Sequence, residues 1–463
     1  MNLSHIKYFP DKYYICLDGF DLENLSTFTD DSNFTQQQAI YLHEYYHYLT
    51  NVTTFFGVRQ FNCGFQDRIR LATVLLAKND IDAFPIKTNT QDNCKYEKSY
   101  WDSVQEILDF DDLDKDFVTK VESTPSKSFH ISNYSKEILP ISVVCNGVEK
   151  SGYHIYHKFY VKDVPNADYF NLSDAMIDEF LSGSIDEFMF QHNLADSSVL
   201  PIIQERPIYP YRTFEKILEF FNCNVYEIEP IHKILLSYFA LHSANPIDAL
   251  IRVLEQLSKN GYKEFIEQPE IYLKKCLEGN EINMYVTILN YEFFFIKECY
   301  EQGRKNLGDT MVLLHNIQEE SVQMLKNDFF CFVRPFMINN IETDDGRVEF
   351  LNRFKVIRER MKEPIIVKNR KMVGADTDIF KNHLSMLIAI HEILDSLYVN
   401  QIATRLQSRK YKYAYPVESD HSDNIASFGG PPLLETWQVA LNELGLYKVY
   451  LNLAKKSNTK TYI

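Results

Sequence analysis

Hydrophobic residues follow two different periodicities along the chain. Residues 12–25 begin with alternating aromatic and apolar positions, which is typical of a strand that enters a turn at Gly19. Residues 141–146 and 153–162 also alternate, and the Asn-Gly dipeptide after the first of them favours a β-hairpin. From Ser173 onward, apolar residues recur at three- and four-residue spacing, which indicates helices. We expect these helices over residues 173–192, 213–222, 231–242, 246–259, 283–301, 309–328, 376–407 and 434–453.

One further helix is predicted close to the N-terminus. Thr35 and Gln38 have the spacing of a capping box, in which the two side chains satisfy the first backbone amides of a helix. Leu42, Tyr46 and Leu49 then recur at helical spacing, so we expect this helix to continue to about residue 57.

The patterns together predict an α+β fold that is predominantly helical. Residues 347–373 interrupt the helical part and have the composition of strands. Pro207 and Pro210 separate a mixed half from a helical half, and we therefore place a domain boundary there. The prediction is a first domain over 1–210 and a mainly helical second domain over 211–463.

Charge and glycine content narrow the function classes. The chain has 463 residues, with 48 Lys and Arg against 64 Asp and Glu, a formal net charge of −16. A nucleic-acid-binding protein needs a basic surface to neutralise phosphates, so we expect no nucleic-acid partner. Only 15 glycines occur, and neither of the glycine-rich nucleotide-binding motifs is present. This lowers the expectation of a mononucleotide or dinucleotide site.

The cysteines and the N-terminus indicate a cytoplasmic protein. Eight cysteines are scattered through the chain without a Cys-x-x-Cys pair, a pattern typical of reduced thiols rather than of a disulfide framework. The first ten residues lack the basic and apolar regions of a signal peptide. No stretch of about 18 uncharged apolar residues occurs, so we expect no membrane span and no membrane partner.

One motif carries chemistry. His43-Glu44-Tyr45-Tyr46-His47 is an H-E-x-x-H sequence inside the predicted N-terminal helix. Residues four apart share a helical face, so His43 and His47 can hold one metal ion through their imidazole nitrogens. Glu44 lies about 100° around the helix from His43. Zinc lowers the pKa of a bound water to about 7, and Glu44 can take its proton as general base.

The sequence HEYYHYLTN at 43–51 resembles the zincin superfamily of metallopeptidases, and more narrowly bacterial intracellular proteins that carry such a helix. The resemblance implies a small twisted sheet beside the active-site helix in the N-terminal half and one Zn²⁺ per chain. It also implies a third metal ligand on a later helix and hydrolysis of peptide bonds. The chain departs from the metzincin pattern, because no third histidine follows His47 at the metzincin spacing.

Glutamates in later helices are candidates for the third ligand. Glu187 is our first choice, because it lies beside Ile185 and Phe188, where a carboxylate must be paired or coordinated. The small residues 182–184 also permit this helix to approach another closely. A glutamate on the second helix resembles the gluzincin arrangement. Glu392 in a very apolar helix is the rival, and a residue outside these two remains an alternative.

The sequence therefore predicts a zinc-dependent endopeptidase with Glu44 as general base and a protein or peptide as substrate. The helical part, 211–463, then restricts access or binds a substrate or a protein regulator. Tyr209 and Tyr211 are candidate donors to the oxyanion, although packing is the commoner role of tyrosines. Two alternatives stay open: a non-catalytic interaction protein with a structural or vestigial metal, and a hydrolase of non-peptide amides.

Overall fold

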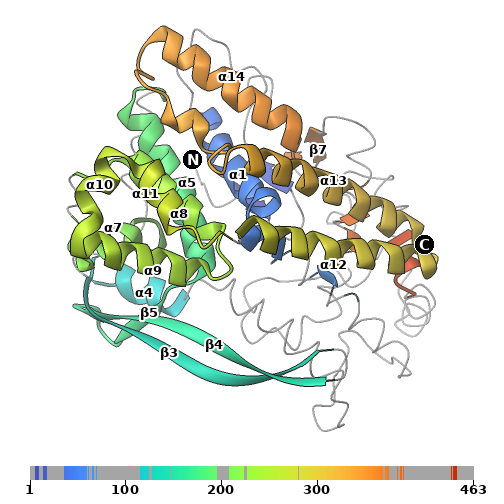
Figure 1. Cartoon of the computed structure of the whole chain (residues 1–463), viewed down its shortest axis with the longest axis horizontal. Coiled ribbons are helices and arrows are strands. Elements are labelled where there is room, and N and C mark those ends of the chain that lie inside the picture. Colours follow the sequence, from blue (N-terminus) through green and yellow to red (C-terminus); the bar gives the residue numbers. More distant parts are fainter. Residues whose placement is uncertain are drawn as a thin grey trace.

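Helices form most of the described structure, as the sequence predicts, and two small sheets accompany them (Figure 1). A computed structural model describes residues 6–9, 14–17, 36–59, 115–124, 128–145, 148–195, 208–223, 227–279, 281–368 and 371–374, with isolated residues elsewhere. The expected α+β, predominantly helical class is confirmed for this part of the chain. None of the described helices is long and apolar enough to cross a membrane.

Helix α1 (Gln36–Thr53) is buried along nearly its whole length and lies among the other helices (Figure 1). Its tyrosine hydroxyls donate to backbone carbonyls far along the chain: Tyr48 to Met361 at 2.6 Å and Tyr45 to Lys362 at 3.1 Å. Such carbonyls lack partners at a helix end, and a buried phenol also needs one, so each contact satisfies both groups. The aromatic residues around the motif thus fix α1 in the fold.

Helix α5 (Asp174–Gln191) packs against α1 on one side and α8 (Pro230–Leu241) on another. The Ser173 side chain caps α5 by accepting from the Met176 amide. The small residues Ser182, Gly183 and Ser184 are buried, and Ser182 Oγ lies 3.4 Å from His47 Nδ1 on α1. The predicted close approach of this helix to another is therefore confirmed.

The first sheet is built on a long β-hairpin, as the alternating pattern predicts. Strands β3 (His130–Cys145) and β4 (Val148–Lys162) pair antiparallel, and β5 (Tyr169–Asn171) joins the outer side of β4. The hairpin is longer than expected, because β3 begins well before residue 141. One face of its base packs on the core through Phe159, which stacks on Phe170.

The second sheet joins strands near the N-terminus to strands within residues 365–374. Its order is β1 (Ile6–Phe9), β2 (Tyr14–Leu17), β6 (Ile365–Lys368) and β7 (Lys371–Gly374). Strands β2 and β6 pair in parallel, with Ile15 opposite Ile366. Two of its strands come from the N-terminal half, where a small sheet is expected, and two lie in or at the end of the segment 347–373, where the sequence also predicts strands.

Helix α14 (Asp344–Met361) corrects the prediction of strands over 347–373. Phe350, Phe354 and Ile357 are buried on one face at helical spacing, and the Thr343 hydroxyl caps the helix by accepting from the Gly346 amide at 3.1 Å. The strand interpretation holds only for β6 and β7 at the end of that segment. Local composition was misleading because the buried face recurs every three or four residues.

The helices predicted over 213–222, 246–259, 283–301 and 309–328 are present as α7 (Thr213–Phe220), α9 (Pro246–Gln256), α12 (Glu281–Glu301) and α13 (Lys305–Asn327). The structure adds three short helices that the spacing did not predict, α4 (Lys115–Glu122), α10 (Tyr262–Glu267) and α11 (Pro269–Cys276), and single turns at Ile208–Arg212, Leu257–Gly261 and Arg334–Met337. The expected helices over 376–407 and 434–453 fall mostly outside the described residues. Helices from both sides of the predicted boundary near residue 210 contact one another, because α5 packs on α8 and α1 packs on α13.

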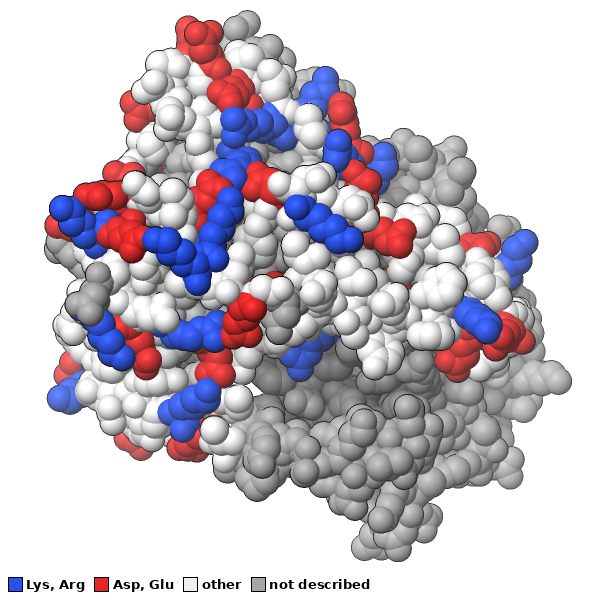
Figure 2. Space-filling model, viewed as in Figure 1, with Lys and Arg blue, Asp and Glu red and all other residues white. Residues whose placement is uncertain are grey.

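Acidic and basic side chains are interspersed over the helices on the face that Figure 2 draws. Many of them form ion pairs, and Glu270 is the centre of one network. It accepts from Arg334 Nη1 at 2.7 Å and Lys274 Nζ at 2.6 Å. These bonds, from Arg334 first, lower the pKa of Glu270 to about 2 although burial opposes them.

Candidate metal centre

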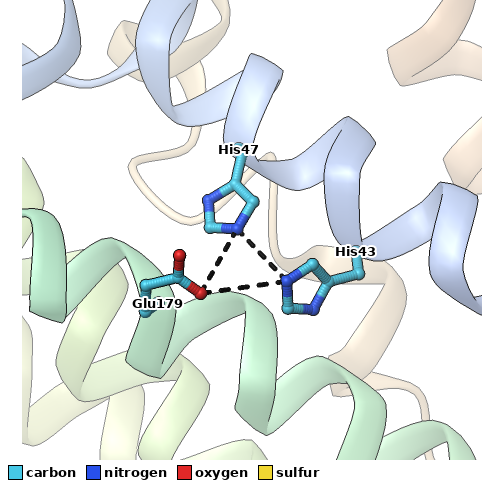
Figure 3. A group of neighbouring side chains, drawn as sticks. All are labelled: His43, His47 and Glu179. Carbon is cyan, nitrogen blue, oxygen red and sulfur yellow. Dashed lines mark hydrogen bonds and ion pairs between the residues drawn. The ribbon is translucent and has the colours of Figure 1, made fainter. Parts of the chain in front are cut away.

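Three side chains from α1 and α5 point toward one another (Figure 3). The Nε2 atoms of His43 and His47 are 3.2 Å apart, as expected for residues one helical turn apart. Glu179 Oε2 lies 3.7 Å from His47 Nε2 and 4.0 Å from His43 Nε2. The predicted pair of histidines is therefore brought together, and a carboxylate from α5 faces both rings.

Two aspartates hold the outer nitrogens of the histidines. His43 Nδ1 lies 2.8 Å from Asp186 Oδ2, and His47 Nδ1 lies 2.7 Å from Asp178 Oδ2. Each carboxylate accepts a hydrogen bond from Nδ1, which leaves the Nε2 lone pair directed at the space between the three side chains. This tautomer is the one in which a histidine binds a metal through Nε2.

The inner atoms of the group need a cation. Two Nε2 lone pairs at 3.2 Å repel each other unless a proton or a metal lies between them. Glu179 Oε2 is buried and has no hydrogen-bond partner among the described residues, a costly arrangement for a carboxylate. Burial disfavours the imidazolium, but Asp178 and Glu179 together raise the pKa of His47 to about 10.

The residues fit a zinc ion. Two nitrogens bound tetrahedrally at about 2.05 Å lie about 3.3 Å apart, close to what the two histidines show. The contacts from Glu179 to the rings, 3.7 and 4.0 Å, exceed that spacing by less than 1 Å. Two histidines and one glutamate are a donor set of catalytic zinc sites, which keep a fourth position for water or substrate.

Glu44 lies beside this group on α1 and is buried, with 8% of its surface exposed. Its charge contributes to the raised pKa of His47, after the larger effects of burial, Asp178 and Glu179. The side chain of Glu179 is 22% exposed as a whole, but its Oε2 atom, which faces the histidines, is buried. The position of Glu44 on α1 is compatible with the role of a general base.

The structure does not bring Glu187 to the histidines. Glu187 Oε2 accepts from Lys233 Nζ of α8 at 2.8 Å, and Lys233 also lies 3.4 Å from Glu215. The carboxylate is paired, as its apolar neighbours require, but with a lysine instead of a metal. Glu392 lies outside the described residues.

Glu179 was missed, although the sequence holds a signal for it. Glu179, Ser182 and Asp186 follow the i, i+3, i+7 spacing of one helical face, and Ser182 and Asp186 contact the histidines of α1. Glu187 is turned about 100° from Asp186, which directs it to α8. The polar face of α5, rather than the apolar neighbours of one glutamate, marks the side that meets α1.

The two tyrosines considered for the oxyanion differ in their surroundings. Tyr209 is buried among aromatic rings, with its centroid 4.9 Å from that of Phe117 and 5.7 Å from that of Phe170. This is the packing role that the sequence favours for it. Tyr211 is half-buried in the turn that precedes α7. No contact of either tyrosine with the histidines is among those of the described residues.

Comparisons with known proteins add no assignment to this geometry: no family model, curated protein or solved structure matches the chain.

Proposed function

We propose that the protein is a zinc-dependent peptidase whose metal is held by His43, His47 and Glu179. The observation that carries the proposal is the convergence of two Nε2 atoms and one buried, unpartnered carboxylate oxygen within coordination reach of a single ion. The H-E-x-x-H sequence adds Glu44 beside that ion, the residue that such a hydrolase needs as a base. Glu179 takes the place that we first gave to Glu187.

The residues of the chain divide the chemistry among them. Zinc bound here would lower the pKa of a coordinated water to about 7 and polarise a carbonyl group. Glu44 accepts the proton of the attacking water and passes it to the leaving amine. Asp186 and Asp178 keep the Nδ1 protons on the rings, which holds both Nε2 atoms toward the ion.

The substrate class follows from the resemblance to zincins, and we propose a protein or peptide that is cleaved inside the cytoplasm. Free thiols at Cys223, Cys276 and Cys331 support a reducing compartment. The set of three protein ligands favours catalysis over a structural role, because structural zinc sites are closed by four. That count refers to the described part of the chain.

Metal analysis combined with two matched variants tests the proposal. Purified wild-type protein should contain about one zinc per chain. Glu44→Gln should keep that zinc and cleave a fluorescence-quenched peptide library about two to four orders of magnitude more slowly. Glu187→Gln, on the same helix as Glu179 but paired to Lys233, is the control and should keep both zinc and cleavage.

Three outcomes would contradict the proposal. Wild-type protein purified without chelators and free of any transition metal would remove the metal centre. A zinc-loaded Glu44→Gln variant that cleaves as fast as the wild type would remove Glu44 as the base. Zinc without cleavage of any peptide, but with release of an amine from small amides, would favour the non-peptide amidase.

A further inference from the structure

Asp178 joins α5 to α1 through both of its carboxylate oxygens. Oδ2 accepts from His47 Nδ1 at 2.7 Å, and Oδ1 accepts from the Thr50 hydroxyl at 2.6 Å. His47 and Thr50 are three residues apart and therefore share one face of α1. The Thr50 hydroxyl also lies 2.9 Å from His47 O, but the contact with the charged carboxylate is shorter. A hydroxyl has one proton, and a charged acceptor is the stronger competitor for it.

Asp178 also precedes Glu179 directly on α5. An Asp178 side chain held to α1 at two points restricts the rotation and translation of this turn of α5 against α1. The position of Glu179 beside the two Nε2 atoms depends on the same restriction. Asp186, the other carboxylate at the site, contacts His43 about two turns further along α5 and is not adjacent to Glu179.

We propose that Thr50 and Asp178 are positioning residues of the metal centre, and this inference rests on the proposed zinc site. Asp178 fixes the ring of His47 and the turn that presents Glu179, and Thr50 fixes the carboxylate of Asp178. The pair thereby aligns two of the three ligands, one from each helix. Thr50 is 2% exposed, so water does not readily replace its hydroxyl. Without that hydroxyl, Asp178 Oδ1 loses a charge-assisted bond, and the His47 ring gains rotational freedom.

Threonine offers an isosteric test in the same helix. Thr50→Val removes the hydroxyl at nearly constant volume, and Thr50→Ser restores it. Thr53→Val is the matched control, because Thr53 is equally buried and its hydroxyl donates to Leu49 O of α1 at 2.7 Å. The zinc dissociation constant of each full-length variant is measured by competition with a chromophoric chelator. The visible spectrum of the Co²⁺-loaded protein reports ligand geometry, and the urea midpoint reports stability.

Loss of an outer partner of a metal-binding histidine typically weakens metal binding about 10- to 100-fold, which we expect for Asp178→Asn. Thr50→Val should weaken zinc binding less than Asp178→Asn, by about threefold or more, because the bond between His47 and Asp178 persists. It should also shift the Co²⁺ bands. Thr50→Ser should restore the wild-type values, and Thr53→Val should leave both unchanged whatever its effect on the urea midpoint.

Either of two results overturns the inference while the zinc site stands. Thr50→Val with wild-type zinc affinity and Co²⁺ spectrum would show that the hydroxyl has no positioning role. Equal weakening by Thr50→Val and Thr53→Val would show a general loosening of α1. Wild-type protein that binds no zinc overturns the proposed function itself, and the inference with it. Zinc binding by the wild type therefore distinguishes a failure of the proposed function from a failure of this inference. If Asp178→Asn fails to fold, the threonine variants still decide the question.

Discussion

Removal of the carboxylate at position 179 should weaken zinc binding while the fold survives. Glu179→Gln keeps the shape of the side chain but replaces an anionic oxygen with a weaker, neutral ligand. The apparent binding free energy of four-ligand zinc sites is about 10–16 kcal/mol, so one ligand accounts for about 2.5–4 kcal/mol. The zinc dissociation constant should therefore rise by about two to three orders of magnitude. The metal-free variant should stay folded and lose only about 1 kcal/mol of stability, because Glu179 interacts with the histidines by charge alone and is partly exposed.

Glu187→Gln should lower the stability of the fold and leave zinc binding unchanged. It weakens an ion pair with Lys233, whose side chain is 8% exposed, while that of Glu187 is 27% exposed. Loss of one partner of a buried pair costs about 3–5 kcal/mol. Glu215, 3.4 Å from Lys233, remains as a second partner. We therefore expect a loss of about 1–2 kcal/mol in the free energy of unfolding and an unchanged zinc affinity.

The assay for both variants is a chelator titration followed by urea denaturation of the metal-free proteins. A Glu187→Gln variant that loses zinc while Glu179→Gln retains it would refute the geometry of the site. Retention of zinc by both variants would mean that another residue, including one outside the described ranges, supplies the third ligand.

Three further predictions use other contacts. Tyr48→Phe leaves the Met361 carbonyl without its donor and should lower the free energy of unfolding by about 1–3 kcal/mol in urea denaturation; an unchanged midpoint would count against this contact. Glu270 has a folded pKa near 2, below its ordinary 4.5, so the folded protein binds fewer protons and loses this stabilisation as the pH falls from about 4.5 to 2. Glu270→Gln should reduce the change in the free energy of unfolding over that pH window by about 1–2 kcal/mol, because solvent screens this partly exposed pair. Urea denaturation at several pH values measures it, and an identical pH dependence in the variant would exclude the pair with Arg334. His43→Ala should release zinc from a protein that stays folded by circular dichroism, whereas unfolding would favour a structural role for the metal.

Patterns confined to one helix or hairpin were readable from the sequence. The helical spacing of 173–192 corresponds to α5, and the alternation around 141–162 corresponds to the hairpin of β3 and β4. The pairing of His43 with His47 was readable for the same reason, because residues four apart in a helix are neighbours whatever surrounds them. Local composition misled in α14, where the helical spacing of Phe350, Phe354 and Ile357 was the better guide.

The sequence alone determined that His43, Glu44 and His47 lie close together, because all three lie within about one turn of one helix. The partners from other elements were decided by how those elements pack. Glu179 and Glu187 both lie in apolar turns of α5, and only the orientation of α5 between α1 and α8 directs one to the histidines and the other to Lys233. The bond from Thr50 to Asp178 and the parallel pairing of β2 with β6 likewise join residues distant in sequence. Such contacts depend on the rotation of each helix and the alignment of each strand against its neighbour, which the burial of the whole core sets and no local pattern specifies.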